Sequence, residues 1–206
     1  MDKTLMDRKG LIKKFRADGI LDAAIKVIAK RGLEKATMEQ VAEEAGISKA
    51  TIYLYYRNKD DLYFHCVVDR LDRILKGLKE AVVGIDDPIR RLEAIVAAQA
   101  RAIEGQREFF RIFFTEKVSL FHDQSREFGR EFDRRQQEFA GLYMGALKEG
   151  MDRGLLRRMD PVKAFYLLLS MVRGLAVHRV VRGDETPLVD DAGTILDVFL
   201  TGLKTG

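Results

Sequence analysis

The stretch from Thr37 to Lys59, TMEQVAEEAGISKATIYLYYRNK, constrains the fold more than any other part of the chain. It predicts two short helices joined by a tight turn. Thr37 and Gln40 have the spacing of a capping box at the start of the first helix, and Ser48 can cap the second. Gly46 suits the positive φ at which a helix ends sharply. Two helices joined in this way form a helix-turn-helix, whose second helix can enter a DNA major groove.

The second of these helices is predicted to have one side toward the core and one toward solvent. Ile52 and Tyr56 lie four residues apart and share the core side. Lys49 and Tyr53 share another side, where burial of the tyrosine hydroxyl beside Lys49 would be costly. We therefore expect Lys49 and Tyr53 to point outward, where Lys49 can reach a base edge. The alternative is that the tyrosines only pack a small core.

The segment GISKATIYLYYRNKDDL resembles the signature of the tetracycline-repressor (TetR) family of bacterial regulators. The shared pattern is Gly, aliphatic, Ser/Thr, any, small, Thr, aliphatic, Tyr, any, Tyr/His, aromatic, any, Asn/Ser, Lys, two acids and Leu. The preceding AAIKVIAKRGLEKATMEQVAEEAGIS resembles the same family, so the similarity spans roughly residues 15 to 65. Beyond this segment only the length and the all-helical pattern agree with the family.

The resemblance implies a dimer that binds a near-palindromic DNA operator and is released by a small effector. In the family, effector binding spreads the two DNA-binding heads and weakens DNA binding, which implies repression. Transferred position by position, the motif implies roles for eight residues. Lys49, Thr51 and Tyr53 would read or brace bases, Thr37, Ser48, Tyr55 and Lys59 would hold phosphates, and Ala50 lies beside them.

Composition favours a folded, all-α protein. The chain has 206 residues, of which 47% are hydrophobic and 33% charged, and it contains three prolines. A net charge of +4 permits nucleic-acid binding without demonstrating it. The single cysteine excludes an internal disulfide, the N-terminus lacks the apolar core of a signal peptide, and no apolar run approaches the ~20 residues of a membrane span. We expect a cytoplasmic protein.

We expect about nine helices in two parts. Residues 1–60 form a three-helix DNA-binding domain, and residues 61–206 form a helical bundle for ligand binding and dimerisation. Residues 1 to about 15 are either a frayed terminus or a basic arm that touches phosphates or the minor groove. The predicted helices outside the central motif span residues 16–31, 59–84, 87–104, 119–151, 161–181 and 188–203, and the apolar FFRIFF segment spans residues 109–114.

Eight of the twelve phenylalanines lie between Phe109 and Phe139. Aromatic residues at helical spacing usually form plain core, and the alternative is the wall of an apolar ligand cavity that carries a few polar groups. The candidate cavity residues are Phe109, Phe110, Phe113, Phe114, Phe132, Tyr143, Arg173 and His178. His178 is also compatible with a buried or interface histidine that is hydrogen-bonded.

The last two helices have spare apolar faces, which predicts a two-fold dimer in which the pair meets its own copy as a four-helix bundle. The alternative is that both faces pack within one chain. The candidate interface residues are Leu167, Met171, Gly174, Leu175, Ile195 and Phe199.

The sequence offers little for catalysis or metal binding. The three histidines lack the spacing of a zinc site, and no GxSxG, GxGxxG or P-loop string occurs. We therefore predict a ligand-responsive regulator of transcription, most simply a repressor, that is not an enzyme and needs no cofactor or metal. The alternatives are a constitutive DNA-binding regulator with a filled core, an enzyme in the C-terminal part, and a helical interaction module.

Overall fold

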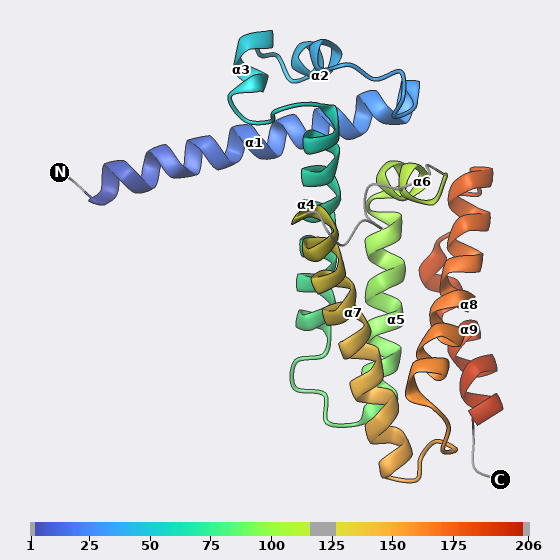
Figure 1. Cartoon of the computed structure of the whole chain (residues 1–206). Coiled ribbons are helices and arrows are strands. Elements are labelled where there is room, and N and C mark those ends of the chain that lie inside the picture. The colour runs from blue at the N-terminus through green and yellow to red at the C-terminus, as the bar shows by residue number, and fades with distance from the viewer. Residues whose placement is uncertain (1–2, 116–126, 204–206) are drawn as a thin grey trace. The chain divides into compact units, whose positions relative to one another are not determined.

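The computed structural model describes residues 3–115 and 127–203, with side chains for residues 10–115 and 128–203. Over these ranges the chain forms helices and no strands (Figure 1), so the predicted all-α class is confirmed. The helices are α1 Lys3–Arg31, α2 Met38–Glu44, α3 Lys49–Tyr53, α4 Lys59–Ala81, α5 Pro88–Glu104, α6 Arg107–Thr115, α7 Glu127–Asp152, α8 Pro161–Arg182 and α9 Leu188–Leu203.

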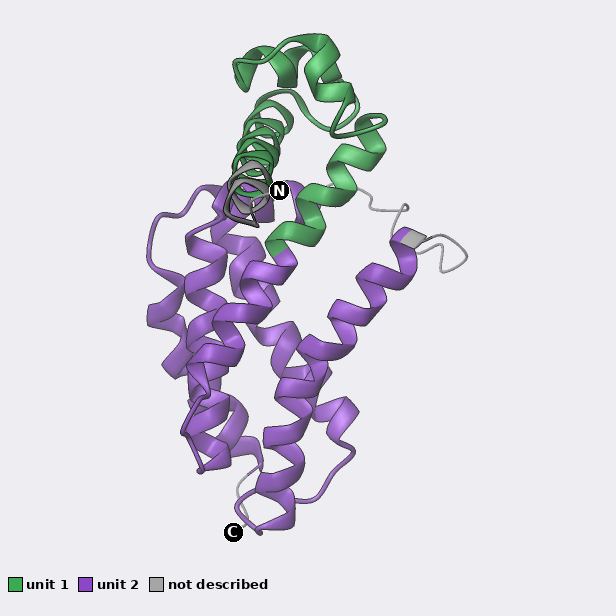
Figure 2. Ribbon diagram, turned by 90° about the vertical axis from the view of Figure 1, so that its left-hand side faces the viewer, with its two compact units in different colours: residues 1–70 green, residues 71–206 purple. Residues whose placement is uncertain are grey.

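The chain divides into two compact units, residues 1–70 and residues 71–206 (Figure 2). The division falls inside α4, which contributes residues 59–70 to the first unit and residues 71–81 to the second. One continuous helix therefore belongs to both units. The assignment of DNA binding to residues 1–60, and of ligand and dimer contacts to residues 61–206, stays a prediction.

The predicted helix starts in the first unit are present. Thr37 Oγ1 accepts from the Gln40 backbone N–H at 3.3 Å, and Gln40 Oε1 accepts from the Thr37 N–H at 3.2 Å. Ser48 Oγ accepts from the Thr51 N–H at 3.1 Å. Gly46 has φ +67°, a conformation that side chains with a Cβ rarely adopt. The capping box, the turn and the second cap are thus formed as predicted, and they set the direction in which α3 begins.

The core of the first unit lies between α1, α2, α3 and the start of α4. Ile52 and Tyr56 are buried, as their spacing predicted, and the Tyr56 hydroxyl donates to the Ala17 carbonyl at 3.4 Å. Cys66 is also buried, its Sγ lies 3.7 Å from the Leu21 carbonyl oxygen, and burial raises the pKa of its thiol. Within α3 itself, Ile52 is the buried residue that packs in this core.

α1 begins thirteen residues earlier than the predicted start at Arg16. The expected frayed terminus or arm is instead helical from Lys3 onward. Leu11 and Phe15 are 71% and 81% exposed, so these two apolar residues do not stabilise the extension by burial. Elongation of a helix that is already anchored costs little per residue, and no proline interrupts this segment.

The second unit is built around α5, which packs against α6, α7, α8 and α9. α5 and α8 each begin with an Asp-Pro pair whose aspartate caps the helix: Asp87 accepts from the Ile89 and Arg90 N–H groups at 2.8 and 2.9 Å, and Asp160 accepts from the Val162 N–H at 2.9 Å. α7 is described from Glu127, and its predicted start near residue 119 lies outside the described residues.

Two ion pairs join α7 to the part of α4 that lies in the second unit. Arg135 binds Asp72 through two hydrogen bonds of 2.7 and 2.9 Å, and Lys79 binds Glu138 at 2.8 Å. The Arg135 side chain is buried and also binds Glu131 within α7 at 2.5 Å. α4 is therefore fastened to the bundle by charged side chains in addition to its buried apolar residues.

α8 has one buried side and one exposed side. Leu168, Val172 and Ala176 are fully buried, whereas Leu167 and Leu175 are 55% and 37% exposed. The second apolar face predicted for α8 is thus not covered within one chain. The prediction for α9 was wrong in part, because its interface candidates Ile195 and Phe199 are buried inside the unit.

α8 also corrects an expectation about hydropathy. Among the described residues, it is the one helix whose length and composition would allow it to cross a membrane, whereas no such run was expected. An apolar core helix of a protein without membrane segments passes the same criterion. Since one side of α8 packs in the core of the second unit, its composition does not identify a membrane segment.

Candidate nucleic-acid interface and ligand cavity

Lys49 and Tyr53 lie on the outer side of α3. The Lys49 side chain is 64% exposed and Tyr53 is 45% exposed, so the predicted outward direction of both is confirmed. The Lys49 Nζ forms an ion pair with Glu39 Oε1 of α2 at 2.5 Å. This hydrogen bond raises the pKa of Lys49 and lowers that of Glu39. The first turn of α3 therefore presents a cation that a neighbouring carboxylate already holds.

The other residues assigned to DNA are exposed or half-buried, and several have structural partners. Ser48 Oγ and Thr51 Oγ1 share a hydrogen bond of 2.8 Å. The Lys59 Nζ donates to the Glu34 carbonyl at 2.8 Å, which leaves two of its three N–H groups. Thr37 and Ala50 are exposed and Tyr55 is half-buried. Their roles in DNA binding stay predictions.

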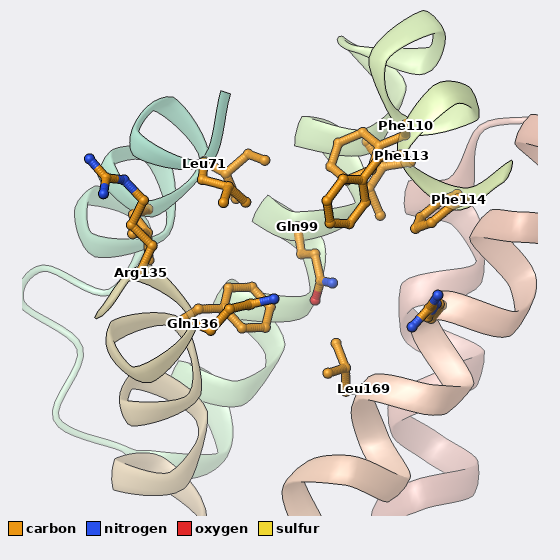
Figure 3. Close-up of a pocket in the computed structure, with 13 residues that line it drawn as sticks. Leu71, Gln99, Phe110, Phe113, Phe114, Arg135, Gln136 and Leu169 are labelled. Carbon is orange, nitrogen blue, oxygen red and sulfur yellow. The ribbon is translucent and has the colours of Figure 1, made fainter. Parts of the chain in front are cut away.

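The second unit contains an apolar cavity of about 120 Å³ (Figure 3). An apolar cavity of roughly 150 Å³ can hold benzene, so this somewhat smaller space is close to the size of one small ring or a short chain. Five helices contribute to it. The lining residues are Leu71, Ile74 and Leu75 of α4, Gln99 and Ile103 of α5, Phe110, Phe113 and Phe114 of α6, Arg135, Gln136 and Phe139 of α7, and Leu169 and Arg173 of α8.

Four of the eight predicted cavity residues line this space: Phe110, Phe113, Phe114 and Arg173. The other four do not. Phe109 is buried in the core and stacks on the lining residue Phe113 with ring centroids 5.6 Å apart, without lining the cavity itself. Phe132 lies on α7 outside the lining. His178 is exposed, so neither a cavity role nor a buried hydrogen bond fits it in the single chain.

Tyr143 takes part in the cavity indirectly. It is fully buried, and its hydroxyl donates a hydrogen bond to Gln99 Oε1. Figure 3 shows Gln99 pointing into the space between α7, α6 and α8. Gln99 was missed at the sequence level because a single glutamine among the buried residues of a helix has no spacing that marks it as functional. Its role became visible only when the structure placed Tyr143 of α7 beside it.

The two arginines that line the cavity differ in their partners. The Arg135 guanidinium is held by Asp72 and Glu131, and Figure 3 shows it turned away from Gln99, so its methylene groups form the wall. The Arg173 guanidinium lies over the Phe114 ring, 5.7 Å from its centroid. Within the described ranges no carboxylate pairs with Arg173. Over the same ranges no group of three or more potential metal ligands occurs.

Two family models match the chain. Residues 20–66 match the bacterial regulatory proteins of the tetR family, and residues 86–177 match the C-terminal domain of tetracyclin repressor-like proteins. Together these matches cover the helix-turn-helix and most of the second unit. The chain belongs to the tetR family. This tetR-family protein is therefore a DNA-binding regulator of transcription.

Two curated relatives extend over most of this regulator. The HTH-type transcriptional repressor KstR2 of Rhodococcus jostii is 26% identical over 94% of this chain and 93% of its own length. The fatty acid metabolism regulator protein of Bacillus subtilis is 20% identical over 89% of this chain and 93% of its own.

The solved structures agree with the fold of this regulator. The crystal structure of the transcriptional regulator FadR from Bacillus subtilis, in complex with stearoyl-CoA, aligns with a TM-score of 0.78 at 19% identity. The alignment covers 89% of this chain and 97% of that one. At this level of identity the likeness shows the fold alone.

Proposed function

We propose that this regulator represses its target genes by binding a near-palindromic operator as a homodimer, and that a small, largely apolar effector in the cavity releases it. The observation that carries the proposal is the position of Leu71, Ile74 and Leu75 in the cavity wall. All three belong to α4, which continues into the unit that contains the helix-turn-helix. An effector that prefers one of two positions of α4 would thereby change DNA binding, typically by 1–3 kcal/mol.

The chemistry of the cavity and the names of the relatives agree on the class of effector. The lining is apolar except for two glutamines and two arginines. One curated relative is a fatty acid metabolism regulator, and the FadR structure contains stearoyl-CoA. We infer an acyl chain or a small ring system as the part of the effector that enters the cavity.

The DNA contacts are assigned to residues 1–60, which lie within the first unit. Lys49, Thr51 and Tyr53 read or brace bases, and the groups at the ends of α2 and α3 hold phosphates. The exposed positions of Lys49 and Tyr53 support this assignment. A chromosomal operator as the partner implies a cytoplasmic location.

The dimer is assigned to the uncovered side of α8. Leu167 and Leu175 are exposed on it, Gly174 lies beside them, and Met171 is half-buried. A helix-turn-helix regulator usually binds two half-sites, so a two-fold interface on this side would supply the second DNA-binding domain.

Alanine substitution of the α3 residues tests the DNA assignment. We expect Lys49→Ala combined with Tyr53→Ala to weaken operator binding at least about tenfold, since a good base contact is worth roughly 1–3 kcal/mol. Binding is measured by fluorescence anisotropy on an operator selected from random DNA, over a range of salt concentrations. Lys163→Ala, an exposed lysine of α8, is the control. Unchanged affinity in the double variant would refute the reading role of α3.

A thermal-shift screen of acids, acyl thioesters and ring compounds, followed by operator release, tests the effector assignment. A true effector raises the melting temperature and lowers operator affinity. A set of compounds that does neither would favour the constitutive regulator over the effector-controlled one.

A further inference from the structure

Of the four polar side chains that line the cavity, Arg135 and Arg173 can only donate hydrogen bonds, whereas Gln136, which is exposed, carries both an acceptor and donors. The Oε1 atom of Gln99 already accepts a hydrogen bond from the Tyr143 hydroxyl, so the amide N–H groups of Gln99 are what remains for a ligand. Arg135 is held by two carboxylates and faces away from the centre of the cavity (Figure 3). The available donors thus call for a ligand that brings acceptors.

Arg173 is the cation at the exposed side of this space. It is exposed while also lining the cavity, which places it where the cavity meets solvent. Arg179 lies six residues further along the same helix and has carboxylate partners. Its side chain pairs with Asp191 at 2.6 Å and with Asp184 at 3.6 Å. Arg173 has no such pair in the described part of the chain, and its one described interaction is the stacking on Phe114.

Stacking on Phe114 holds the guanidinium plane without using its N–H groups. The edge of the plane stays free to donate two parallel hydrogen bonds, an arrangement that matches carboxylate and phosphate oxygens. A neutral apolar ligand would gain nothing from this fork, whereas an anion beside an apolar cavity gains a charge-assisted contact.

We infer that the effector is an amphipathic anion. Its acidic group binds Arg173, and its apolar part enters the cavity. A further hydrogen-bond acceptor of the effector binds the amide N–H groups of Gln99. This inference rests on the effector-controlled function proposed above. The acidic group is either the carboxylate of a free acid or a phosphate of the coenzyme A part of an acyl thioester, because both present negatively charged oxygens to the guanidinium. By the benzene comparison, the described space of about 120 Å³ takes roughly five carbon atoms.

The experiment measures binding of octanoate, octanoyl-CoA and octan-1-ol to the full chain by calorimetry, together with operator release by anisotropy. The variants are Arg173→Met, which removes the charge and keeps the length of the side chain, and Arg182→Met, an exposed arginine of the same helix outside the cavity. Both positions are exposed, so both variants are expected to fold.

We expect the unaltered chain to bind octanoate or octanoyl-CoA at least about tenfold more tightly than octan-1-ol, the size of one charge-assisted hydrogen bond. Arg173→Met reduces this preference to within about twofold, and Arg182→Met retains it. Tighter binding of octanoate identifies the free acid as the source of the anion, and tighter binding of octanoyl-CoA identifies the thioester. Either result supports the inference.

Equal binding of octan-1-ol and the anions, or anion binding that is unchanged by Arg173→Met, would overturn the inference. If octan-1-ol then releases the operator, the effector-controlled function stands and only the anion requirement falls. If none of the three compounds binds or releases the operator, the inference and the proposed function fall together.

Discussion

At the residue scale, two cations of this protein differ in what already holds them. Lys49 on α3 is paired with Glu39 on α2, whereas Arg173 at the cavity lies over Phe114 and pairs with no carboxylate of the described residues. The exposure of Lys49 was predictable from its spacing relative to Ile52 on one helix. Its pairing with Glu39 was not, because the two residues lie ten positions apart on different helices whose angle the sequence does not define.

Substitution of Glu39 is expected to strengthen operator binding. Glu39→Gln removes the competitor for the Lys49 ammonium and one negative charge near the phosphates, so we expect about a three- to tenfold gain in affinity at moderate salt. The control is Glu43→Gln, an exposed glutamate of the same helix that makes the same change in charge. Equal gains from both variants would show a general effect of charge and would remove any specific role of the Lys49–Glu39 pair.

At the scale of helices, the prediction succeeded where an apolar stripe and a cap both marked an element. The ends of α2, the start of α5 and the start of α8 were each given by a capping residue at the expected position. It failed for residues 3–15 of α1, of which residues 10–15 are exposed and therefore carry no buried stripe. The cavity was predictable only in part. The FFRIFF segment supplies three of its lining residues, Phe110, Phe113 and Phe114. Gln99 and Phe139 line it only because five helices pack together.

The turn of the helix-turn-helix depends on Gly46, whose φ is +67°. Gly46→Ala places a side chain in the left-handed region, and we expect it to lower the free energy of unfolding by about 1–2 kcal/mol and to weaken operator binding. Urea denaturation followed by circular dichroism measures the change. Gly141→Ala is the matched control: Gly141 is exposed within α7 with no atom near an added Cβ, so this variant should stabilise the protein. The same sign for both variants would contradict the assigned role of the turn.

The contact of Asp72 with Arg135 joins α4 to α7 beside the cavity. We expect Asp72→Asn to destabilise the chain by only about 1 kcal/mol, because Arg135 keeps Glu131 as a partner. Effector affinity should persist while the effector releases the operator less completely, since α7 then follows α4 less closely. Calorimetry and anisotropy on one sample separate the two quantities, with Asp86→Asn, an exposed loop residue, as the control. Undiminished release would exclude this pair from the transmission of the signal.

For the whole molecule, the uncovered side of α8 is the feature that the single chain leaves unexplained. Leu167 is 55% exposed and Tyr166 is 60% exposed on a helix whose other side is fully packed. The apolar pattern of the sequence predicted two such faces, on α8 and α9. It could not tell that Ile195 and Phe199 of α9 would be covered by the same chain, because burial within a chain and burial between chains leave the same pattern.

A charge placed on this side is expected to separate the dimer. Leu167→Glu should shift the mass measured by sedimentation from a dimer to a single chain, since burial of an unpaired carboxylate is costly. Operator affinity should fall at the same time, because one half-site contact is lost. Leu155→Glu makes the same change at a 45% exposed leucine outside α8 and should have neither effect. A stable dimer of Leu167→Glu would place the interface elsewhere.

The composition of the cavity wall has a practical consequence. Three of its aromatic side chains come from α6, a single helix of nine residues that lies far in sequence from the segment assigned to promoter recognition. A mutant library confined to codons 107–115 would therefore alter which compounds the protein binds while leaving the operator sequence that it recognises unchanged. The chain is accordingly a suitable starting point for biosensors whose input and output are engineered separately.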